Sequence, residues 1–372
     1  MKDHILITGG AGFIGSHLAD ELLKRGYRVR VLDCLSAQVH GPGQARPDYL
    51  NPEVELQIGD VRDPDAAANA LEGVDAVFHF AAAVGVGQSM YQVNHYTSVN
   101  NLGTAVLLEE LIQKQVQRLI VASSMSIYGE GLYQTHGGDI CSPEGRGLEQ
   151  LKNRKWESRA ANGSDLLPIP TPETKPASLS SVYALSKYDQ ERLCLLIGRA
   201  YGIPTVALRF FNVYGSRQAA SNPYTGVLAI FASRLLNDHA PLVFEDGKQR
   251  RDFVSVYDVV QACVLALEEK SVSDAVFNVG SGRSYTVLET AAALSKVLGK
   301  EHIDPQITET YRMGDIRHCF ADIRLARAVL GYEPHYTLEN GLGELAEWLE
   351  GQQVIDRVAE AQTELASRGL AL

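Results

Sequence analysis

Short apolar runs alternate with helical stretches along the first third of the chain. Five runs have the length and composition of strands: HILIT (4–8), YRVRVLD (27–33), VELQIGD (54–60), AVFHFAA (76–82) and RLIVASS (118–124). Helical stretches lie between several of them, including SHLADELLKRG (16–26) and GTAVLLEELIQK (103–114). Repeated strand–helix–strand order predicts an α/β fold, a Rossmann-type doubly wound parallel sheet covered by helices on both faces.

The pattern changes after residue 215. A further strand, TVALRFFNVYG (205–215), follows a helix that begins near Tyr183, and beyond it only PLVFEDG (241–247) and AVFNVGSG (275–282) have the character of strands. We therefore expect a nucleotide-binding Rossmann domain at 1–215 and a smaller, mainly substrate-binding lobe at 216–345, laid over the carboxyl edge of the sheet. Residues 346–372 are expected to form a C-terminal helical tail, with one or two polar surface helices within 344–368.

Residues 131–176 interrupt the first domain. This segment is rich in glycine, proline and charge and has no clear periodicity. A long irregular insertion in a compact domain is often a functional lid. The alternatives are a surface elaboration or a contact to another subunit, and the sequence leaves all three open.

Composition limits the possible partners and locations. The chain has 372 residues and a formal net charge of −11, which argues against a nucleic-acid partner. It contains no apolar run of membrane-spanning length. The five cysteines are scattered without a C-x-x-C pair, which suits a reducing cytoplasm and argues against a disulfide framework or a thiolate zinc site. An anionic substrate would need a local cluster of arginines.

A glycine-rich turn follows the first expected strand. In ITGGAGFIGSHLADELL, glycines at 9, 12 and 15 precede a helix. Glycine permits a tight turn and close approach of the backbone to a pyrophosphate, and the helix N-terminus supplies free N–H groups. A tight turn without a ligand is the alternative interpretation of Gly9, Gly12 and Gly15.

Acidic residues at the ends of the next two strands favour the ligand. Asp33 lies eighteen residues after Gly15, where a carboxylate would bind the adenosine ribose and repel a 2′-phosphate. NAD is therefore favoured over NADP. Asp60 and Val61 end the third strand and are predicted to meet the adenine edge, with a simple strand-end cap as the alternative for Asp60.

The stretch SVYALSK supplies candidate chemistry. Tyr183 and Lys187 are spaced i, i+4 and share one face of a helix. A phenol is a poor base at its reference pKa near 10, and a neighbouring ammonium would lower that pKa. Of the sixteen tyrosines, only Tyr183 has a lysine four positions on. The alternative is that Tyr183 and Lys187 are two surface residues of a helix with no shared function.

A serine cluster ends the strand 118–124. Ser124 lies at the carboxyl edge of the sheet, where ligands bind in such folds. Its hydroxyl is predicted to bind a sugar oxygen and pass the proton to Tyr183. Ser123 and Ser126 are close in sequence, so the choice within the cluster stays open, and the serines could instead satisfy the backbone.

Taken in order, these motifs resemble the extended short-chain dehydrogenase/reductase family, specifically its nucleotide-sugar epimerases and dehydratases. The resemblance rests on TGGAGFIG, Asp33, HFAAAVGVGQS, SSMSIYG, YALSK and RFFNVYG, and it runs from about residue 3 to 345 apart from the insertion. It implies that Tyr183 is the base, Lys187 its partner and a ribose ligand, and Ser124 the sugar contact. It also implies a homodimer through the Tyr183 helix and further cofactor residues at Phe13, Ile14, Ala81, Ala82 and Asn100, the last bracing the active-site helix.

The same resemblance separates two reactions. In the related 4,6-dehydratases an Asp-Glu pair follows the catalytic hydroxyl residue, and this chain has Met125 and Ser126 there. Neither side chain transfers a proton as a carboxyl group does, so elimination is disfavoured. The expected reaction is inversion at C4: Tyr183 removes the C4 hydroxyl proton, hydride leaves C4, and it returns to the other face of the 4-keto sugar.

Substrate contacts are likewise implied by resemblance. A nucleoside diphosphate is expected to bind through charge-assisted contacts of arginines, the sugar through the loop containing Gln88, and the base near Tyr224 and Val227. Each arginine alone could instead be a surface ion pair. The remaining members of the predicted substrate set are Ser124, Ser126, Asn212, Arg217, Arg251 and Arg312.

The insertion resembles that of a subgroup of dTDP-L-rhamnose 4-epimerases. Several members carry a cysteine knuckle where this chain reads RAANG (159–163), so no metal site is predicted. The favoured substrate is dTDP-L-rhamnose or another dTDP- or UDP-hexose. A nucleotide-sugar reductase or 4,6-dehydratase is the enzymatic alternative. A non-catalytic NAD-binding sensor is the alternative of another class, which the presence of both Tyr183 and Lys187 disfavours.

Overall fold

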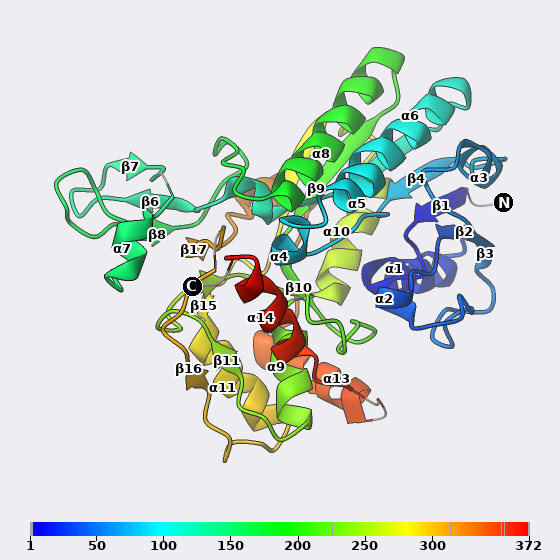
Figure 1. The fold of residues 1–372 in the computed structure, drawn as a ribbon. Helices are drawn as coiled ribbons and strands as arrows, with labels where there is room; N and C mark the ends of the chain where they lie inside the picture. Colours follow the sequence, from blue (N-terminus) through cyan, green and yellow to red (C-terminus); the bar gives the residue numbers. More distant parts are fainter. Residues whose placement is uncertain are drawn as a thin grey trace.

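The computed structural model describes residues 3–143, 145–224, 226–312, 314–350, 352 and 354–370. Its centre is a seven-stranded parallel sheet in the order β14-β9-β5-β4-β1-β2-β3 (Figure 1). The strands are β1 (His4–Thr8), β2 (Arg28–Asp33), β3 (Glu55–Ile58), β4 (Ala76–His79), β5 (Arg118–Ser124), β9 (Thr205–Phe210) and β14 (Ala275–Val279). The predicted doubly wound α/β fold is confirmed.

Helices cover both faces of this sheet. On one face α1 (Phe13–Lys24) and α10 (Val256–Glu268) contact each other, and on the other lie α3 (Pro64–Ala70), α6 (Gly103–Gln113) and α8 (Val182–Tyr201). Their apolar faces bury the β-branched residues of the strands, which is the main stabilising contribution. Short segments follow the strands toward the carboxyl edge: α2 (Ala37–His40), α4 (Val86–Ser89), α5 (Val93–Thr97), a π-helical turn (Ser98–Leu102) and a 3-10 turn (Met125–Tyr128).

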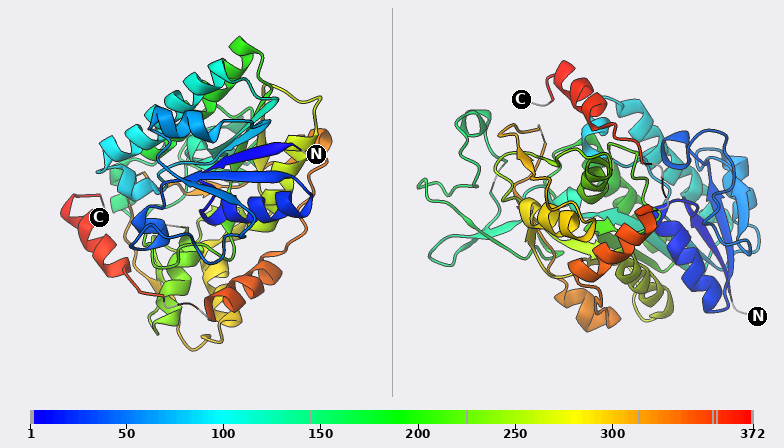
Figure 2. Two further views of the ribbon diagram at one scale, coloured as in Figure 1. Left: turned by 90° about the vertical axis from the view of Figure 1, so that its right-hand side faces the viewer. Right: turned by 90° about the horizontal axis from the view of Figure 1, so that it is seen from below.

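A smaller lobe covers the carboxyl edge of the sheet (Figures 1 and 2). Its core lies between α9 (Val227–Leu236), α11 (Val287–Val297) and α13 (Leu338–Glu350). The pairs β10 (Asn212–Tyr214) with β13 (Phe253–Ser255) and β11 (Leu242–Val243) with β16 (Gln306–Ile307) are parallel. The other elements of the lobe are β12 (Arg250–Arg251), β15 (Tyr285–Thr286), β17 (His318–Cys319) and α14 (Val358–Ser367). Helix α12 (Arg324–Leu330) packs instead on α10 and β14.

The boundary between the two parts differs from the one expected at residue 215. Helix α10 packs on α1, and β14 pairs with β9 from Ala275↔Val206 to Val279↔Phe210, so both belong to the nucleotide-binding part. The expected strand 205–215 is two strands, because β9 ends at Phe210 and β10 turns into the lobe to pair with β13. The chain thus crosses between the parts more than once.

The insertion 131–176 has more structure than its composition indicates. It contains α7 (Leu148–Lys152) and an antiparallel sheet, in the order β7-β6-β8, that projects from the body of the molecule (Figures 1 and 2). These strands are β6 (Leu132–Gln134), β7 (Ile140–Cys141) and β8 (Leu167–Ile169).

Among the described residues, no helix is long and apolar enough to cross a membrane.

Buried ion pairs join the insertion to the lobe. The side chain of Arg317 has no exposed area and contacts Glu157 of the insertion at 2.5 Å, Glu245 at 2.9 Å and Asp246 at 2.7 Å. Arg146 of the insertion contacts Glu245 at 2.8 Å from the other side. A buried cation among carboxylates is costly to remove, because Glu245, which is 2% exposed, would be left desolvated with one cation fewer.

Replacing Arg317 by methionine should therefore lower the free energy of unfolding by about 3–5 kcal/mol. Arg154→Met is the matched control, because Arg154 also joins the insertion to the lobe, through Glu309, with both side chains more than half exposed. That exposed pair should contribute less than about 1 kcal/mol. Urea unfolding followed by tryptophan fluorescence measures both variants, and equal midpoints would show that the buried network does not stabilise the junction.

Candidate active site

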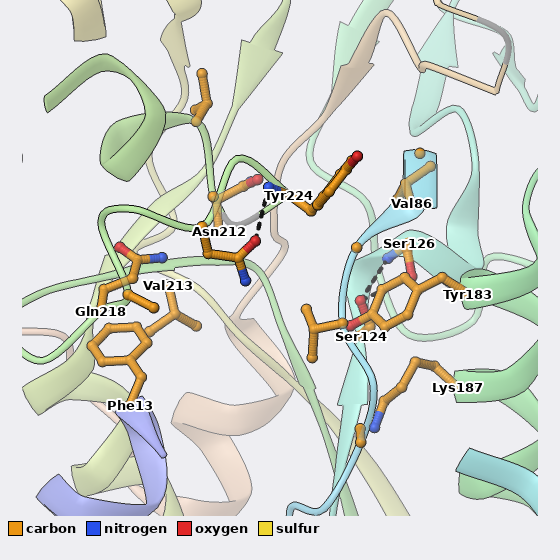
Figure 3. A pocket seen from close by; sticks show the side chains of 18 of the residues that line it. Phe13, Val86, Ser124, Ser126, Tyr183, Lys187, Asn212, Val213, Gln218 and Tyr224 are labelled. Carbon is orange, nitrogen blue, oxygen red and sulfur yellow. Dashed lines mark hydrogen bonds between the residues drawn. The ribbon is translucent and has the colours of Figure 1, made fainter. Parts of the chain in front are cut away.

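A cavity of about 710 Å³ lies at the carboxyl edge of the sheet, between the sheet and the lobe. The segments that line it come from the glycine-rich turn, the strand ends, the start of α8, the lobe and α14. Figure 3 shows that Tyr183, Lys187 and Ser124 face the same space as Asn212 and Tyr224. The topology thus brings together residues that are far apart in the sequence.

The glycine-rich turn forms a cradle in which side chains do not fit. Gly9 has φ +69°, and a Cβ there would lie 2.8 Å from the backbone nitrogen of Ala81. A Cβ on Gly15 would lie 2.5 Å from Cα of Gly10. The turn therefore packs backbone on backbone beside the N-terminus of α1. The predicted residues Gly9, Gly12, Phe13, Ile14 and Gly15 all line the cavity.

The acid at the end of β2 is oriented by the backbone. The carboxylate of Asp33 accepts hydrogen bonds from the amides of Ala11, at 3.0 Å, and Leu35, at 2.9 Å. It is held against the glycine-rich turn and lines the cavity. This arrangement fits NAD, because the fixed carboxylate can accept from ribose hydroxyls and would repel a phosphate placed there.

The adenine side contains an ion pair that sequence reasoning missed. Asp60 and Val61 line the cavity as predicted, but Asp60 is paired with Arg62 at 2.6 Å. The pKa of Asp60 is lowered, and the largest cause is its hydrogen bond from the Arg62 side chain. Arg62 is two residues from Asp60 in the sequence, and this short spacing could have indicated the ion pair.

Asn100 braces the site without lining the cavity. Its buried side chain accepts from the amide of Ala83 at 2.7 Å and donates to Ser186 Oγ at 2.9 Å. It thus connects the loop after β4 to α8. Ala81 and Ala82 of that loop line the cavity, as the resemblance implied.

Tyr183 lies in the first turn of α8. Ser181 caps this helix by accepting from the amide of Ala184 at 3.1 Å, and the amide of Tyr183 donates to Ser89 Oγ at 3.0 Å. These bonds fix where the ring enters the cavity. Burial raises the pKa of the Tyr183 phenol, and the hydrogen bond with Ser124 acts in the opposite direction.

Lys187 has a different partner from the one expected. Its ammonium donates to Gln190 Oε1 at 2.5 Å, and Gln190 donates to the carbonyl of Ala81 at 3.2 Å. Burial lowers the pKa of Lys187 to about 8. The expected lowering of the Tyr183 pKa is not present in this structure, in which burial dominates that pKa.

The alternation of side chains along β5 separates Ser123 from Ser124. Ser123 donates to Glu191 at 2.6 Å, beneath α8, whereas Ser124 shares a hydrogen bond of 2.9 Å with Ser126 at the cavity (Figure 3). Met125 accepts from Asn212 through its sulfur at 3.5 Å. In the described part of the chain, the carboxylates that line the cavity are Asp33, Asp60, Glu245 and Asp315, so none neighbours Ser124 in sequence.

Two of the arginines predicted to bind the diphosphate line the cavity. Arg251 donates to the carbonyls of Arg317 and Ile316, at 2.8 and 2.6 Å. Arg312 pairs with Asp315 at 2.9 Å and lies over the ring of Phe244. The predicted residues Asn212, Tyr224 and Val227 also line the cavity.

Two predicted substrate residues do not line the cavity. Arg217 pairs with Asp20 of α1 at 2.7 Å, and its backbone has φ +65°. Gln88 of α4 is buried, and its side-chain oxygen accepts hydrogen bonds from Gln38 at 3.0 Å and Tyr96 at 3.1 Å. Gly85, Val86, Gly87 and Met90 line the cavity in its place.

Sequence reasoning also missed an entire element of the site. Residues of α14, expected to be a polar surface helix, line the cavity, whereas no described residue of the insertion 131–176 does. The apolar spacing 358, 361, 365 was the available signal, since positions three and four apart share a helix face. The lid role of the insertion stays a prediction.

A family model and a known relative both match most of this chain. The model of the NAD dependent epimerase/dehydratase family matches residues 5–144 and 158–280. A dTDP-L-rhamnose 4-epimerase of Burkholderia thailandensis is 36% identical over 358 residues, which cover 95% of this chain and 96% of the relative.

Solved structures show the same fold with ligands bound. The UDP-glucose 4-epimerase of Thermotoga maritima with UDP-glucose has a TM-score of 0.76 and 32% identity, covering 93% of this chain and 98% of that one. The UDP-glucuronic acid 4-epimerase of Bacillus cereus with UDP-glucuronic acid and NAD has a TM-score of 0.74 and 28% identity, covering 93% and 99%. The chain therefore belongs to the NAD dependent epimerase/dehydratase family, and within it to the nucleotide-sugar epimerases, which are isomerases that use NAD.

Proposed function

We propose that this enzyme inverts C4 of a dTDP- or UDP-hexose, with dTDP-L-rhamnose as the favoured substrate. One observation carries the proposal: Tyr183 and Ser124 face a cavity shared with the NAD fingerprint, and methionine and serine follow Ser124 where elimination would need acids. The similarity to the Burkholderia thailandensis enzyme supports the choice of sugar and base.

The residues of the chain divide the work as follows. NAD, when bound, accepts a hydride and gives it back. Tyr183 removes the proton of the C4 hydroxyl and returns it after the sugar has presented its other face. Ser124 holds the reacting oxygen and, through its hydrogen bond, stabilises the phenolate form of Tyr183. Lys187, four positions after Tyr183 on α8, would hold the ribose of bound NAD and supply positive charge that favours the phenolate form of Tyr183.

The diphosphate remains bound while the sugar turns. Arg251 and Arg312 can hold it, since guanidinium groups bind phosphate oxygens in pairs. Both line the cavity and belong to the lobe, whereas Tyr183 belongs to α8. The tether and the reacting atoms are thus held by different parts of the fold, which leaves the hexose free to rotate between them.

The alternative functions lack support from the site. A 4,6-dehydratase needs a proton-transfer pair beside Ser124, and Met125 and Ser126 occupy those places. A reductase would need an exchangeable cofactor, so an assay without added cofactor separates it from an epimerase. A non-catalytic sensor has no use for the Tyr183–Ser124 hydrogen bond, which the site retains.

We also propose that the enzyme is a homodimer. Leu185 and Leu196 on α8 and Leu102 before α6 are about half exposed, and α6 and α8 lie side by side. Leu185 and Leu196 are eleven positions apart and share one face of α8. A second copy of α6 and α8 would cover these leucines and also fix the helix that carries Tyr183.

Replacing Tyr183 by phenylalanine should lower kcat about 10²–10⁴-fold, because it removes the proton acceptor and little else. Bound NAD, measured by absorbance after denaturation, should be unchanged. Tyr188→Phe is the control, since it deletes the same hydroxyl five positions along α8, where the ring packs against the core. Equal activity of Tyr183→Phe and the wild type would contradict the assignment.

A panel of nucleotide sugars tests the reaction itself. Purified enzyme without added cofactor should convert dTDP-L-rhamnose into an isomer of unchanged mass, resolved by chromatography, and should act more slowly on UDP-glucose. A product lighter by one water would restore the dehydratase. Inactivity on every dTDP- and UDP-hexose despite bound NAD would contradict epimerisation.

Replacing Leu196 by arginine should convert the dimer into a monomer, because a charge on the α8 face must then be buried. Analytical ultracentrifugation measures the mass of the wild type and the variant. Leu325→Arg on α12 is the control, with a leucine that is 42% exposed outside the proposed interface. A monomeric wild type would disprove the proposed dimer.

A further inference from the structure

The C-terminal helix α14 spans the cavity from the lobe to the nucleotide-binding part. At its start, Ile355 accepts from Ser233 of α9 at 3.2 Å, and Asp356 pairs with Arg234 at 3.2 Å. At its end, Leu365 lies beside α4, where a Cβ on Gly87 would be 3.4 Å from Leu365 Cδ2. Figure 1 shows the helix between α9 and α4. Both ends are thus fixed on opposite sides of the cavity.

The face of α14 toward the cavity is uncharged. Val358, Ala361 and Leu365 are buried, Gln362 is half-buried, and all four line the cavity. Their spacing places them on one face of the helix, as in an amphipathic helix packed on a core. In this case much of that face borders a cavity, so its side chains are available to a ligand.

Polar contacts hold the far end of the helix. Arg368 pairs with Glu364 at 2.8 Å and lies 4.4 Å from the centre of the Tyr91 ring. The hydroxyl of Tyr91 in turn donates to that of Tyr224 at 2.7 Å, and Tyr224 lines the cavity. Glu364 and Arg368 are therefore paired with each other and do not line the cavity.

The position of α14 relative to Tyr183 assigns it to the sugar end. Leu365 contacts α4 at Gly87, and Ser89 of the same short helix accepts from the amide of Tyr183 at 3.0 Å. A hexose whose C4 lies at Tyr183 would therefore meet the loop 84–87 and the apolar face of α14. In the described chain, the lysines and arginines that line the cavity are Arg62, Lys187, Arg251 and Arg312, and none belongs to either segment.

We propose that α14 is the specificity-determining wall of the sugar site, and that Leu365 with its apolar neighbours selects a hexose with a methyl group at C6. This inference rests on the proposed 4-epimerase function. A methyl group loses water favourably against such a wall. A C6 hydroxyl would lose a hydrogen bond to water without gaining a partner from Leu365, and a C6 carboxylate would be buried without a cation.

The test compares two substrates that differ only at C6, dTDP-L-rhamnose and dTDP-L-mannose. The wild type should prefer the 6-deoxy sugar by kcat/KM on the order of 10²-fold, the size of discrimination that an apolar pocket gives against an added hydroxyl. Leu365→Gln should reduce this ratio at least about tenfold, because the amide can pair with the hydroxyl. Ala366→Gln introduces the same side chain at the neighbouring, exposed position and should leave the ratio unchanged.

A second variant tests the same wall independently, in case Leu365→Gln loses packing. Gln362→Lys changes a half-buried residue on the same wall and should raise kcat/KM for UDP-glucuronate relative to UDP-glucose at least about tenfold, since it supplies the missing cation. Thr363→Lys, at an exposed position, is its control and should give no gain.

The outcomes separate the two levels of the argument. A wild type that epimerises no nucleotide sugar would overturn the proposed function and this inference with it. Normal epimerisation with equal use of both dTDP sugars, or with discrimination unchanged in Leu365→Gln and no gain in Gln362→Lys, would overturn the inference alone. Bound NAD and the thermal unfolding midpoint, measured for every variant, show whether a change in specificity arises in a folded enzyme.

Discussion

The buried ion pair between Glu191 of α8 and Arg209 of β9 fixes the catalytic helix on the sheet. Arg209 donates to both carboxylate oxygens of Glu191, at 2.9 and 2.7 Å, and Ser123 of β5 donates to the same carboxylate at 2.6 Å. Arg209 also donates to the hydroxyl of Tyr128, which donates to Asn278 of β14. A buried pair of this kind contributes little net stability but tolerates only one geometry. The register of α8 against three strands, and with it the place of Tyr183, depends on this interaction.

The same interaction decides which serine is available for chemistry. Successive side chains of a strand point to opposite faces, so the hydrogen bond of Ser123 to Glu191 beneath α8 directs Ser124 away from that carboxylate. Ser124 then meets Tyr183 at the end of β5. The sequence favoured Ser124 because it ends the strand, but it could not exclude the neighbouring serines 123 and 126. The choice depends on a partner that lies 68 positions further along the chain.

The cofactor half of the site was predictable because its chemistry is local. A glycine turn, an acid at the end of the next strand and a tyrosine–lysine pair at helical spacing are each defined within a few residues of sequence, and all of them line the same cavity. Their roles in binding and catalysis stay predictions. The substrate half was less predictable. Arg217 has the residue type expected of a phosphate ligand, but its side chain pairs with Asp20, and its positive φ is not indicated by any pattern in the sequence.

Strand β14 was assigned to the lobe because irregular segments precede it, whereas its pairing with β9 is a contact between residues that are distant in the sequence. Helix α14 was missed because three apolar positions among charged ones resemble an ordinary surface helix until the cavity beneath them is known.

Two elements outside the doubly wound sheet and its helices attach by different physical means, and the difference limits what each can do. The insertion is joined to the lobe by ion pairs of Arg317 and Arg146, and both arginines contact Glu245, a buried carboxylate whose separation from them would be costly. Helix α14 presents an apolar face to a cavity and is held by hydrogen bonds and ion pairs at its start and by Arg368 at its end. Apolar contacts are non-directional, so the side chains on that face can change without disturbing the register of α8 or the backbone cradle of Gly9 and Gly15. If the proposed function holds, the reaction depends on polar contacts with a single geometry, and the choice of sugar depends on a surface whose side chains can vary independently of those contacts.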